Sequence, residues 1–395
     1  MKLDLKIINF FLLLISFAGG FYYHEYLFQE YYERAYSTEG IDCSTLNKTL
    51  DHISINYVDQ EKIDIQKMTE GAISGMVNAL EDPYTEYFNA EGTKSLQESI
   101  TGQFEGIGLQ VGVRDNQITA ISPIKGTPAE KAGIKPKDII LFVDQKSTSE
   151  MSLDEAVNLI RGEKGTTVTL TISRDGIQKD IEITREVINV PTLDWEIIES
   201  QNGEKIAHLT LYHFSETIYQ DFKKAAITIL NSGAKGIILD LRSNPGGLVN
   251  QAINIAGWFL ERGDIVMLEK DKNGKETQFS ANGPSNFSSY PTIVLIDEGS
   301  ASASEILAGA LKDNKETLMI GQKSFGKGTV QKIIDLGEGS SLKITIAKWL
   351  TPKGNVIDKE GITPDIEVEI TLEDYENGKD SQLEKALEEI EKLIK

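Results

Sequence analysis

The sequence predicts a multidomain protein of the α+β and α/β classes, in which a mixed-sheet body carries an inserted small β-domain and an N-terminal helical region. The body is indicated by two apolar runs, Gly236–Asp240 and Thr292–Ile296, each followed by a stretch with helical spacing. Residues 102–176 form short alternating strands separated by turns, which indicates the β-domain. Apolar residues recur at helical spacing over residues 46–57 and 68–80, which predicts the N-terminal helices.

The body is expected to contain a β-α-β crossover, because a helical pattern over residues 216–230 lies between apolar strands at 205–211 and 236–240. A further alternating strand is predicted over residues 342–350. We divide the chain into a signal peptide or signal anchor at 1–23, the N-terminal helical region at 24–98, the β-domain at 99–177, the body at 178–370 and a C-terminal helix at 371–395.

The composition of the chain limits the kinds of partner that it can bind and indicates how its fold is stabilised. The chain has 395 residues, of which 40% are hydrophobic, so it can bury cores of ordinary size. Forty basic against sixty-one acidic residues give a net charge of −21, and such a surface repels polyanions, so we expect no nucleic-acid partner. Cys43 is the single cysteine and cannot form an internal disulfide. No metal-ligand cluster stands out, and no cofactor is expected.

The first 23 residues have the features of a targeting element. Lys2 and Lys6 precede an apolar run over residues 7–23, which is near the lower length limit for a membrane span. Ala18 ends a small-x-small triplet typical of a signal-peptide cleavage site, whereas the aromatic flank at residues 21–23 suits an uncleaved membrane anchor. Both interpretations place the rest of the chain outside the cytoplasm, and the anchor would bind it to the membrane.

Residues 297–331 carry the strongest indication of chemistry. Three serines, Ser300, Ser302 and Ser304, alternate with alanines where an apolar strand gives way to a helix. Unpaired N–H groups at such a helix start can stabilise a developing oxyanion, so one of the serines is a candidate nucleophile. Capping is the structural alternative, because Ser302 with Glu305 three residues later forms the pattern of a capping box.

A serine nucleophile needs a base, and none of the four histidines lies in a recognisable catalytic motif. Lysine can act instead if burial keeps it neutral, which requires its pKa to fall by roughly three units, or about 4 kcal/mol. Lys327 lies between Gly326 and Gly328, which allow close packing, and Gln331 could orient the amine without adding charge. A solvated surface lysine is the structural alternative.

Two other motifs pass through Lys327, and local context argues against both. Residues 321–328 nearly spell a phosphate-binding loop, but Gly328 replaces the required hydroxyl residue and the following residues are strand-like. Ser324 and Lys327 match the S-x-x-K pattern of penicillin-binding proteins, but that motif needs a helix, which the two glycines disfavour.

The stretches G-S-A-S-A-S-E-I at 299–306 and G-Q-K-S-F-G-K-G-T-V-Q at 321–331 closely resemble the carboxyl-terminal processing proteases, also called tail-specific proteases. The resemblance implies a serine endopeptidase in which Ser302 is the nucleophile, Lys327 the general base and Gln331 the partner that orients it. It also assigns the N-x-G-G segment at 244–247 to an oxyanion hole, in which the N–H of Gly246 or Gly247 joins that of Ala303.

The β-domain resembles a PDZ domain through F-E-G-I-G-L-Q-V at 104–111 and T-P-A-E-K-A-G-I at 127–134. In that fold the glycine-rich entrance to the second strand binds a peptide's terminal carboxylate, and the peptide adds as a strand. The resemblance therefore implies protein substrates with accessible C-termini. Arg161 ends the helix predicted at 153–160, and it would contact the substrate carboxylate, contact the body, or complement the helix dipole. The peptide-binding residues implied are Gly106, Ile107, Gly108, Leu109 and Arg161.

Asp82 is a candidate catalytic acid in principle, but a helix-stop turn before Pro83 is the favoured interpretation. The resemblance assigns this segment to the protease body and implies a part for the region in a homodimer. His213 is the one histidine considered as an alternative base, and a structural role is favoured for it. A peptide-binding scaffold without turnover is the rival function, against which the presence of Ser302, Lys327 and Gln331 argues.

Overall fold

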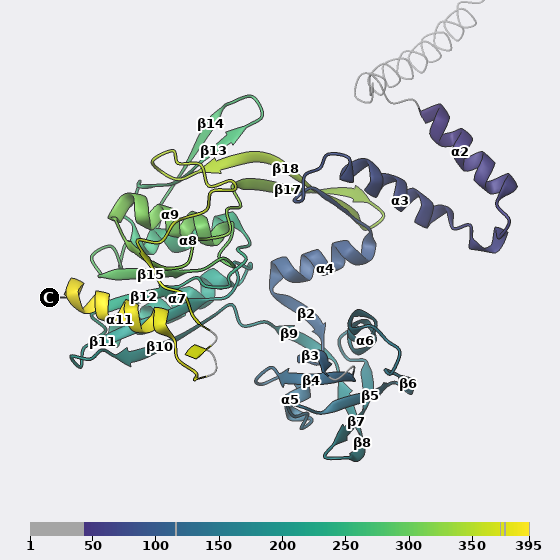
Figure 1. Ribbon diagram of the computed structural model, residues 1–395, viewed down its shortest axis with the longest axis horizontal. Helices are drawn as coiled ribbons and strands as arrows, with labels where there is room; N and C mark the ends of the chain where they lie inside the picture. The colour runs from purple at the N-terminus through teal and green to yellow at the C-terminus, as the bar shows by residue number, and fades with distance from the viewer. Residues whose placement is uncertain (1–42, 115–116, 372, 375–376, 395) are drawn as a thin grey trace, which may run out of the picture. The chain divides into compact units, whose positions relative to one another are not determined.

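The computed structural model describes residues 43–114, 117–371, 373–374 and 377–394, and the chain divides into two compact units, residues 1–72 and 73–395. The first unit contains α2 (Cys43–Asn56) and the 3-10 helix η1 (Gln60–Lys62), and the boundary between the units falls within α3 (Ile65–Asn78) (Figure 1). These helices confirm the predicted helical region. The targeting element at 1–23 lies outside the described residues, and none of the described helices has the length and hydropathy that a membrane span requires.

The β-domain is built on one sheet with strand order β3-β4-β5-β7-β8, to which β6 adds beside β5. Helix α6 (Leu153–Ile160) has the predicted bounds, and a capping box between Ser152 and Glu155 starts it. Its apolar face and the alternate residues of the strands share one buried core. The other elements are β3 (Leu109–Arg114), β4 (Gln117–Pro123), α5 (Pro128–Lys131), β5 (Ile139–Val143), β6 (Lys146–Ser147), β7 (Thr167–Arg174) and β8 (Ile177–Thr184).

The chain enters and leaves the β-domain through a short two-stranded ribbon. Strand β2 (Gln103–Gly106) pairs antiparallel with β9 (Glu186–Asn189). Helix α4 (Ala90–Thr101), which sequence analysis did not predict, leads into β2 and begins at Asn89, whose side chain accepts the Gly92 N–H. The β-domain is thus an insertion within a body that has parts on both sides of it in the sequence.

The body has a six-stranded sheet in the order β10-β11-β12-β15-β16-β19, parallel except for the edge strand β10. Strands β12 and β15 are buried along their whole length, as expected for parallel strands covered on both faces. The predicted bounds of β11, β12 and β15 are confirmed. The strands are β10 (Leu193–Glu199), β11 (Lys205–Leu211), β12 (Gly236–Asp240), β15 (Thr292–Ile296), β16 (Leu318–Gly321) and β19 (Ile366–Glu367).

Helices cover both faces of this sheet. One buried cluster joins α7 (Ile218–Asn231), α8 (Val249–Phe259) and α9 (Ala303–Lys315) to one side of the strands. A second cluster joins α11 (Ser381–Ile394) to the other side through Ala386 and Ile390. Helices α7, α8 and α9 follow strands β11, β12 and β15, so their first turns lie at the carboxyl edge of the sheet. Open α/β folds place their ligand-binding sites at this edge.

A second sheet in the body has the order β1-β18-β13-β14, and β17 also pairs with β18. Strand β1 (Glu86–Phe88) precedes the β-domain in the chain, yet it pairs with β18 (Ser340–Leu350) near the C-terminus. Strand β17 (Thr329–Gly337) confirms that the residues after Lys327 are extended, as the argument against a phosphate-binding loop required. The remaining strands are β13 (Ile265–Asp271) and β14 (Glu276–Ser280).

Candidate active site

Ser302 lies at the turn from β15 into α9. It is the N-cap of the helix, in a capping box with Glu305, and its backbone has φ 55° and ψ −113°, a conformation that is costly for a residue with a side chain. Ser300 and Ser304 are fully buried, and their hydroxyls donate to the carbonyls of Leu241 (2.8 Å) and Asn244 (2.9 Å). Ser300 and Ser304 thus join the start of α9 to the loop after β12, whereas Ser302 has the strained backbone conformation.

The Glu305 carboxylate joins the two segments that sequence analysis singled out. It is 1% exposed, and its Oε2 accepts the amide N–H of Ser302 and the amide N–H of Lys327, both at 2.9 Å. Its Oε1 accepts the Ser324 hydroxyl (2.6 Å) and the Gly326 N–H (2.7 Å). A single oxygen therefore brings the backbones of Ser302 and Lys327 together. Sequence analysis interpreted Glu305 only as part of a capping box and missed this second role.

Lys327 is partly buried at the end of an irregular loop. Burial lowers the pKa of its ammonium, and the nearby positive charge of Lys343 lowers it further, whereas Asp82 and Glu305 act in the opposite direction. Its carbonyl accepts the indole N–H of Trp349 at 2.9 Å, which fixes the backbone. Its Nζ lies 4.8 Å from the ring centroid of Tyr84. No ion pair to Lys327 occurs within the described part of the chain.

The N-x-G-G loop lies against Ser302. A side chain at Gly246 would meet the Ala301 carbonyl oxygen at 2.5 Å and the Ser302 Cβ at 2.8 Å, so only glycine fits there. The Gly246 N–H donates to the Asn244 side chain (2.9 Å), whose own amide donates to the Leu211 carbonyl (2.7 Å). For the Gly247 N–H, in contrast, no acceptor occurs among the described residues. Gly247 is therefore the glycine whose N–H remains available.

A charge cluster anchors this loop from behind. The Arg242 guanidinium bonds to the carboxylates of Asp240 and Asp380 and to the amide oxygen of Gln382. These hydrogen bonds outweigh burial and raise the pKa of Arg242, so it stays charged. Because Arg242 is one residue before Ser243 and the N-x-G-G loop, the cluster ties the loop to helix α11.

Gln331 lies on β17, four residues after Lys327. Its amide nitrogen donates to the hydroxyls of Thr329 (2.9 Å) and Thr345 (3.3 Å). The Thr345 amide N–H donates to Thr85, and Asp82 accepts the Thr85 hydroxyl (2.6 Å) and the Tyr84 N–H (3.1 Å). The aromatic ring of Tyr84, which sequence analysis missed, thus lies over the Lys327 amine. The side chain of Asp82 forms the turn that positions this ring.

The groove of the β-domain is a cavity of about 200 Å³ between β3 and α6. Val157 and Ile160 of α6 form its apolar wall, and Gly106, Ile107, Gly108 and Leu109 line it from the strand side, as predicted. Arg161 also lines it, but its guanidinium pairs with Glu98 of α4 at 2.7 Å and lies 5.0 Å from the Phe104 ring centroid. In this structure Arg161 thus contacts the helix that precedes the β-domain.

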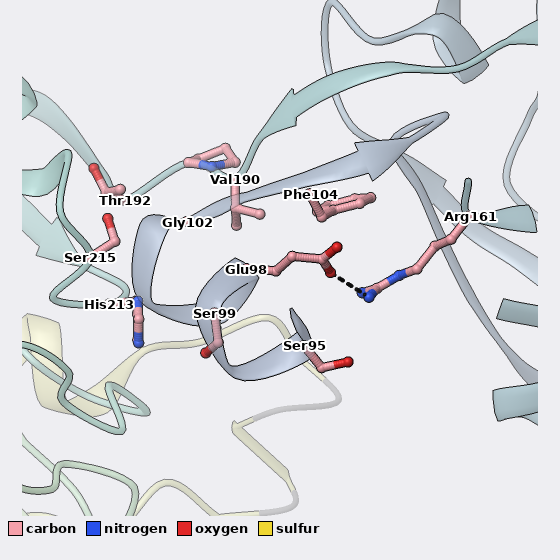
Figure 2. Close-up of a pocket in the computed structure, with 11 residues that line it drawn as sticks. Ser95, Glu98, Ser99, Gly102, Phe104, Arg161, Val190, Thr192, His213 and Ser215 are labelled. Atoms are coloured by element: carbon pink, nitrogen blue, oxygen red, sulfur yellow. Dashed lines mark hydrogen bonds and ion pairs between the residues drawn. The ribbon is translucent and has the colours of Figure 1, made fainter. Parts of the chain in front are cut away.

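Next to the groove is a larger cavity of about 330 Å³, shown in Figure 2. Glu98 and Arg161 point toward each other on one side of it, and His213, Ser215 and Thr192 lie on the other. Burial lowers the pKa of His213, so its ring is neutral over most of the physiological range. No hydrogen bond joins His213 to Ser302 among the described residues. Within those residues no cluster of histidine, cysteine or acidic side chains is arranged to hold a metal ion.

Comparison with known proteins gives three matching family models. "Peptidase family S41" matches residues 205–368, "PDZ domain" residues 95–173, and "Activating protease CtpB N-terminal domain" residues 18–92. The carboxy-terminal processing protease CtpA of Bacillus subtilis is 43% identical over 344 residues, which cover 87% of this chain and 72% of that protein. This chain belongs to the carboxy-terminal processing proteases of peptidase family S41.

Other relatives agree with this assignment. A probable CtpA-like serine protease of Staphylococcus epidermidis is 42% identical over 325 residues, 82% of this chain and 63% of that protein. The solved photosystem II D1 C-terminal processing protease is 29% identical, with a TM-score of 0.52 over 84% of this chain and 87% of that one. A putative S41 protease from Bacteroides fragilis, at 17% identity and a TM-score of 0.55, supports the fold alone. The protein is a serine-type peptidase with a PDZ domain, as the resemblance predicted.

Proposed function

We propose that this carboxy-terminal processing protease cleaves proteins through a Ser302–Lys327 dyad. Neutral Lys327 takes the Ser302 hydroxyl proton while the serine oxygen attacks a peptide carbonyl carbon. The protonated lysine then gives that proton to the departing amine, and water releases the acyl-enzyme with the same lysine as base. The observation that carries the proposal is the buried Glu305 carboxylate, which accepts the amide N–H groups of both residues.

The environment of Lys327 supports its role as base. Burial and Lys343 both lower the pKa of the amine, so a larger fraction is neutral near pH 7 than in a solvated lysine. We further propose that the N–H groups of Gly247 and Ala303 hold the oxyanion, with Asn244 fixing the loop through Gly246. Gln331 is proposed to orient the Lys327 amine, with its own amide nitrogen held by the Thr329 and Thr345 hydroxyls.

Substrates are proposed to be proteins outside the cytoplasm with accessible, apolar C-termini. The groove lined by Gly106, Gly108 and Leu109 has an apolar wall in Val157 and Ile160, and backbone N–H groups at such a strand entrance suit a terminal carboxylate. The apolar run at 7–23 supports an extracytoplasmic location, either as a cleaved signal peptide or as a membrane anchor. We also propose that the N-terminal region supports a homodimer.

A cleavage assay with three serine variants tests the dyad. Ser302→Ala is expected to abolish cleavage of an unstructured protein substrate while its circular dichroism spectrum and peptide binding are unchanged. Ser304→Ala removes the hydrogen bond to the Asn244 carbonyl, and Ser300→Ala removes those to the Leu241 carbonyl and to Asp297, each worth about 1 kcal/mol; both variants are expected to retain turnover. Turnover by Ser302→Ala near the wild-type rate would disprove the nucleophile. A wild-type protein that binds peptides without cleaving any would favour the rival function, a peptide-binding scaffold without turnover.

A further inference from the structure

The turn at residues 82–85, which lies before the PDZ domain in the chain, forms one wall of the Lys327 environment. Asp82 forms a turn in which its carboxylate accepts the Tyr84 N–H and the Thr85 hydroxyl. Thr85 in turn accepts the Thr345 N–H at 3.0 Å, which fixes the turn to β18. The turn is thus tied to the strand next to β17, and it directs the Tyr84 ring to the Lys327 amine, with the ring centroid 4.8 Å from Nζ.

We propose that the Tyr84 ring stabilises the ammonium that forms when Lys327 takes the serine proton, and thereby takes part in catalysis. This inference rests on the proposed role of Lys327 as base. A base in this site is neutral before the attack and positively charged after it. A partner that favours the cation weakly thus helps the transition state without holding the lysine in its protonated form beforehand.

An aromatic face meets this requirement better than a carboxylate would. A cation over a ring at this distance is attracted by the quadrupole of the ring, and the attraction grows as the charge develops. A carboxylate in the same place would form an ion pair and keep the lysine protonated at neutral pH. Asp82 is close enough to raise the pKa of Lys327, but its oxygens are occupied by the turn and it makes no ion pair with the amine within the described residues.

Strand β1, which follows this turn, restrains Lys343, the second lysine near the site. The Lys343 Nζ lies 3.1 Å from the Glu86 carboxylate and 5.0 Å from the Phe88 ring centroid, so β1 holds it in place. Its positive charge opposes that of a protonated Lys327. The titratable groups that face Lys327 are therefore Asp82 and Tyr84 from the turn, Glu305 from α9 and Lys343 from β18, while Asp358 lies near Tyr84.

Burial and the surrounding acids raise the pKa of the Tyr84 hydroxyl, so it stays neutral over the working range. The ring, and not the hydroxyl, is then the acting group, and substitutions at this position can separate the two. Tyr84→Phe keeps the ring, Tyr84→Leu removes it at similar bulk, and Tyr84→Trp strengthens the cation attraction. Tyr87→Leu, three residues further on, is a matched control for the loss of a tyrosine from the segment.

The test is the pH dependence of kcat/KM for one peptide substrate, with Lys327→Ala measured alongside. Tyr84→Leu is expected to move the midpoint of the rising limb to lower pH by about 0.4 to 1.5 units. Its plateau is expected to fall between about 2-fold and 30-fold, because the cation is no longer stabilised. Tyr84→Phe, which keeps the ring, is expected to keep the wild-type midpoint, Tyr87→Leu to match wild type, and Tyr84→Trp to move the midpoint upward.

The sign of the shift separates this role from a merely structural one. If the ring only filled space, its loss would admit water to Lys327, and the midpoint would move upward or stay in place. That result, with Lys327→Ala inactive, would overturn the inference and leave the dyad intact. Wild-type activity in Lys327→Ala would instead overturn the proposed function. If Tyr84→Leu does not fold, the upward shift expected for Tyr84→Trp decides, and its absence would overturn the inference.

Discussion

Replacing Glu305 perturbs the contact on which the active site depends. The glutamine amide of Glu305→Gln can keep its oxygen toward Ser302 and Lys327 and donate from its nitrogen to the Ser324 hydroxyl. The Gly326 N–H, now at 2.7 Å from Oε1, then loses its acceptor. Glu305→Ala leaves all four donors without their acceptor, because the carboxylate that serves them is 1% exposed.

The size of the effect follows from the number of buried donors. One buried N–H without an acceptor costs about 1–3 kcal/mol, so Glu305→Gln should lower kcat/KM by between about 5-fold and 150-fold. Four such donors, at roughly 1 kcal/mol each, cost about 4 kcal/mol, which corresponds to about 1,000-fold for Glu305→Ala. Glu298→Gln is the matched control, because Glu298 is exposed on the same turn. It should behave as wild type.

Peptide hydrolysis gives kcat/KM, and urea unfolding of each variant gives the loss of stability and the folded fraction in the assay. The prediction is a graded loss, wild type above Glu305→Gln above Glu305→Ala, that persists after correction for the unfolded fraction. Glu305→Ala with kcat/KM within about threefold of wild type would show that this carboxylate does not hold the dyad together.

Three further predictions follow from the same site. Lys327→Arg should be inactive at every pH, because the guanidinium stays charged and cannot accept a proton. Wild-type activity should rise with pH through a lysine pKa below the ordinary value, because only the neutral amine is a base. A kcat/KM profile in Lys327→Arg that resembles wild type would contradict this. Asn244→Ala removes the hydrogen bonds to Gly246 and Leu211 and should reduce kcat more than it raises KM. Urea unfolding should show a stability loss of about 1–3 kcal/mol. An unchanged kcat would show that Asn244 does not fix the oxyanion loop. Amidating a substrate's C-terminus should reduce its cleavage at least severalfold, and equal rates for the acid and the amide, measured by chromatography, would refute carboxylate capture.

Much of the body could be predicted from the sequence because its strands are continuous apolar runs. Gly236–Asp240 and Thr292–Ile296 are buried on both faces, so their pattern does not depend on neighbours. Helix α6 was equally clear, because Ser152 and Glu155 mark its start. The four-residue β16 and the two-residue β19, in contrast, are defined by pairing with partners distant in the sequence and carry little local pattern.

The sequence indicates candidate residues for the site but not the contacts between them. Ser302 and Lys327 stand out through small neighbours and flanking glycines, yet nothing local shows that Glu305 serves both of them. Tyr84 is separated from Lys327 by 243 positions and reaches it only because β1 pairs with β18 across the insertion. The Gly246 N–H is taken up by the Asn244 side chain two residues earlier, and that side chain is placed by its hydrogen bond to the distant Leu211 carbonyl, which no local pattern shows.

The most direct test of the dyad is the site and rate of reaction with a fluorophosphonate, followed by intact mass and peptide mapping. Wild type should gain one adduct, located on Ser302, at a rate that rises with pH as Lys327 loses its proton. Folded Lys327→Ala should gain almost none over the same time. An adduct on another residue, or labelling of Lys327→Ala at the wild-type rate, would contradict the account.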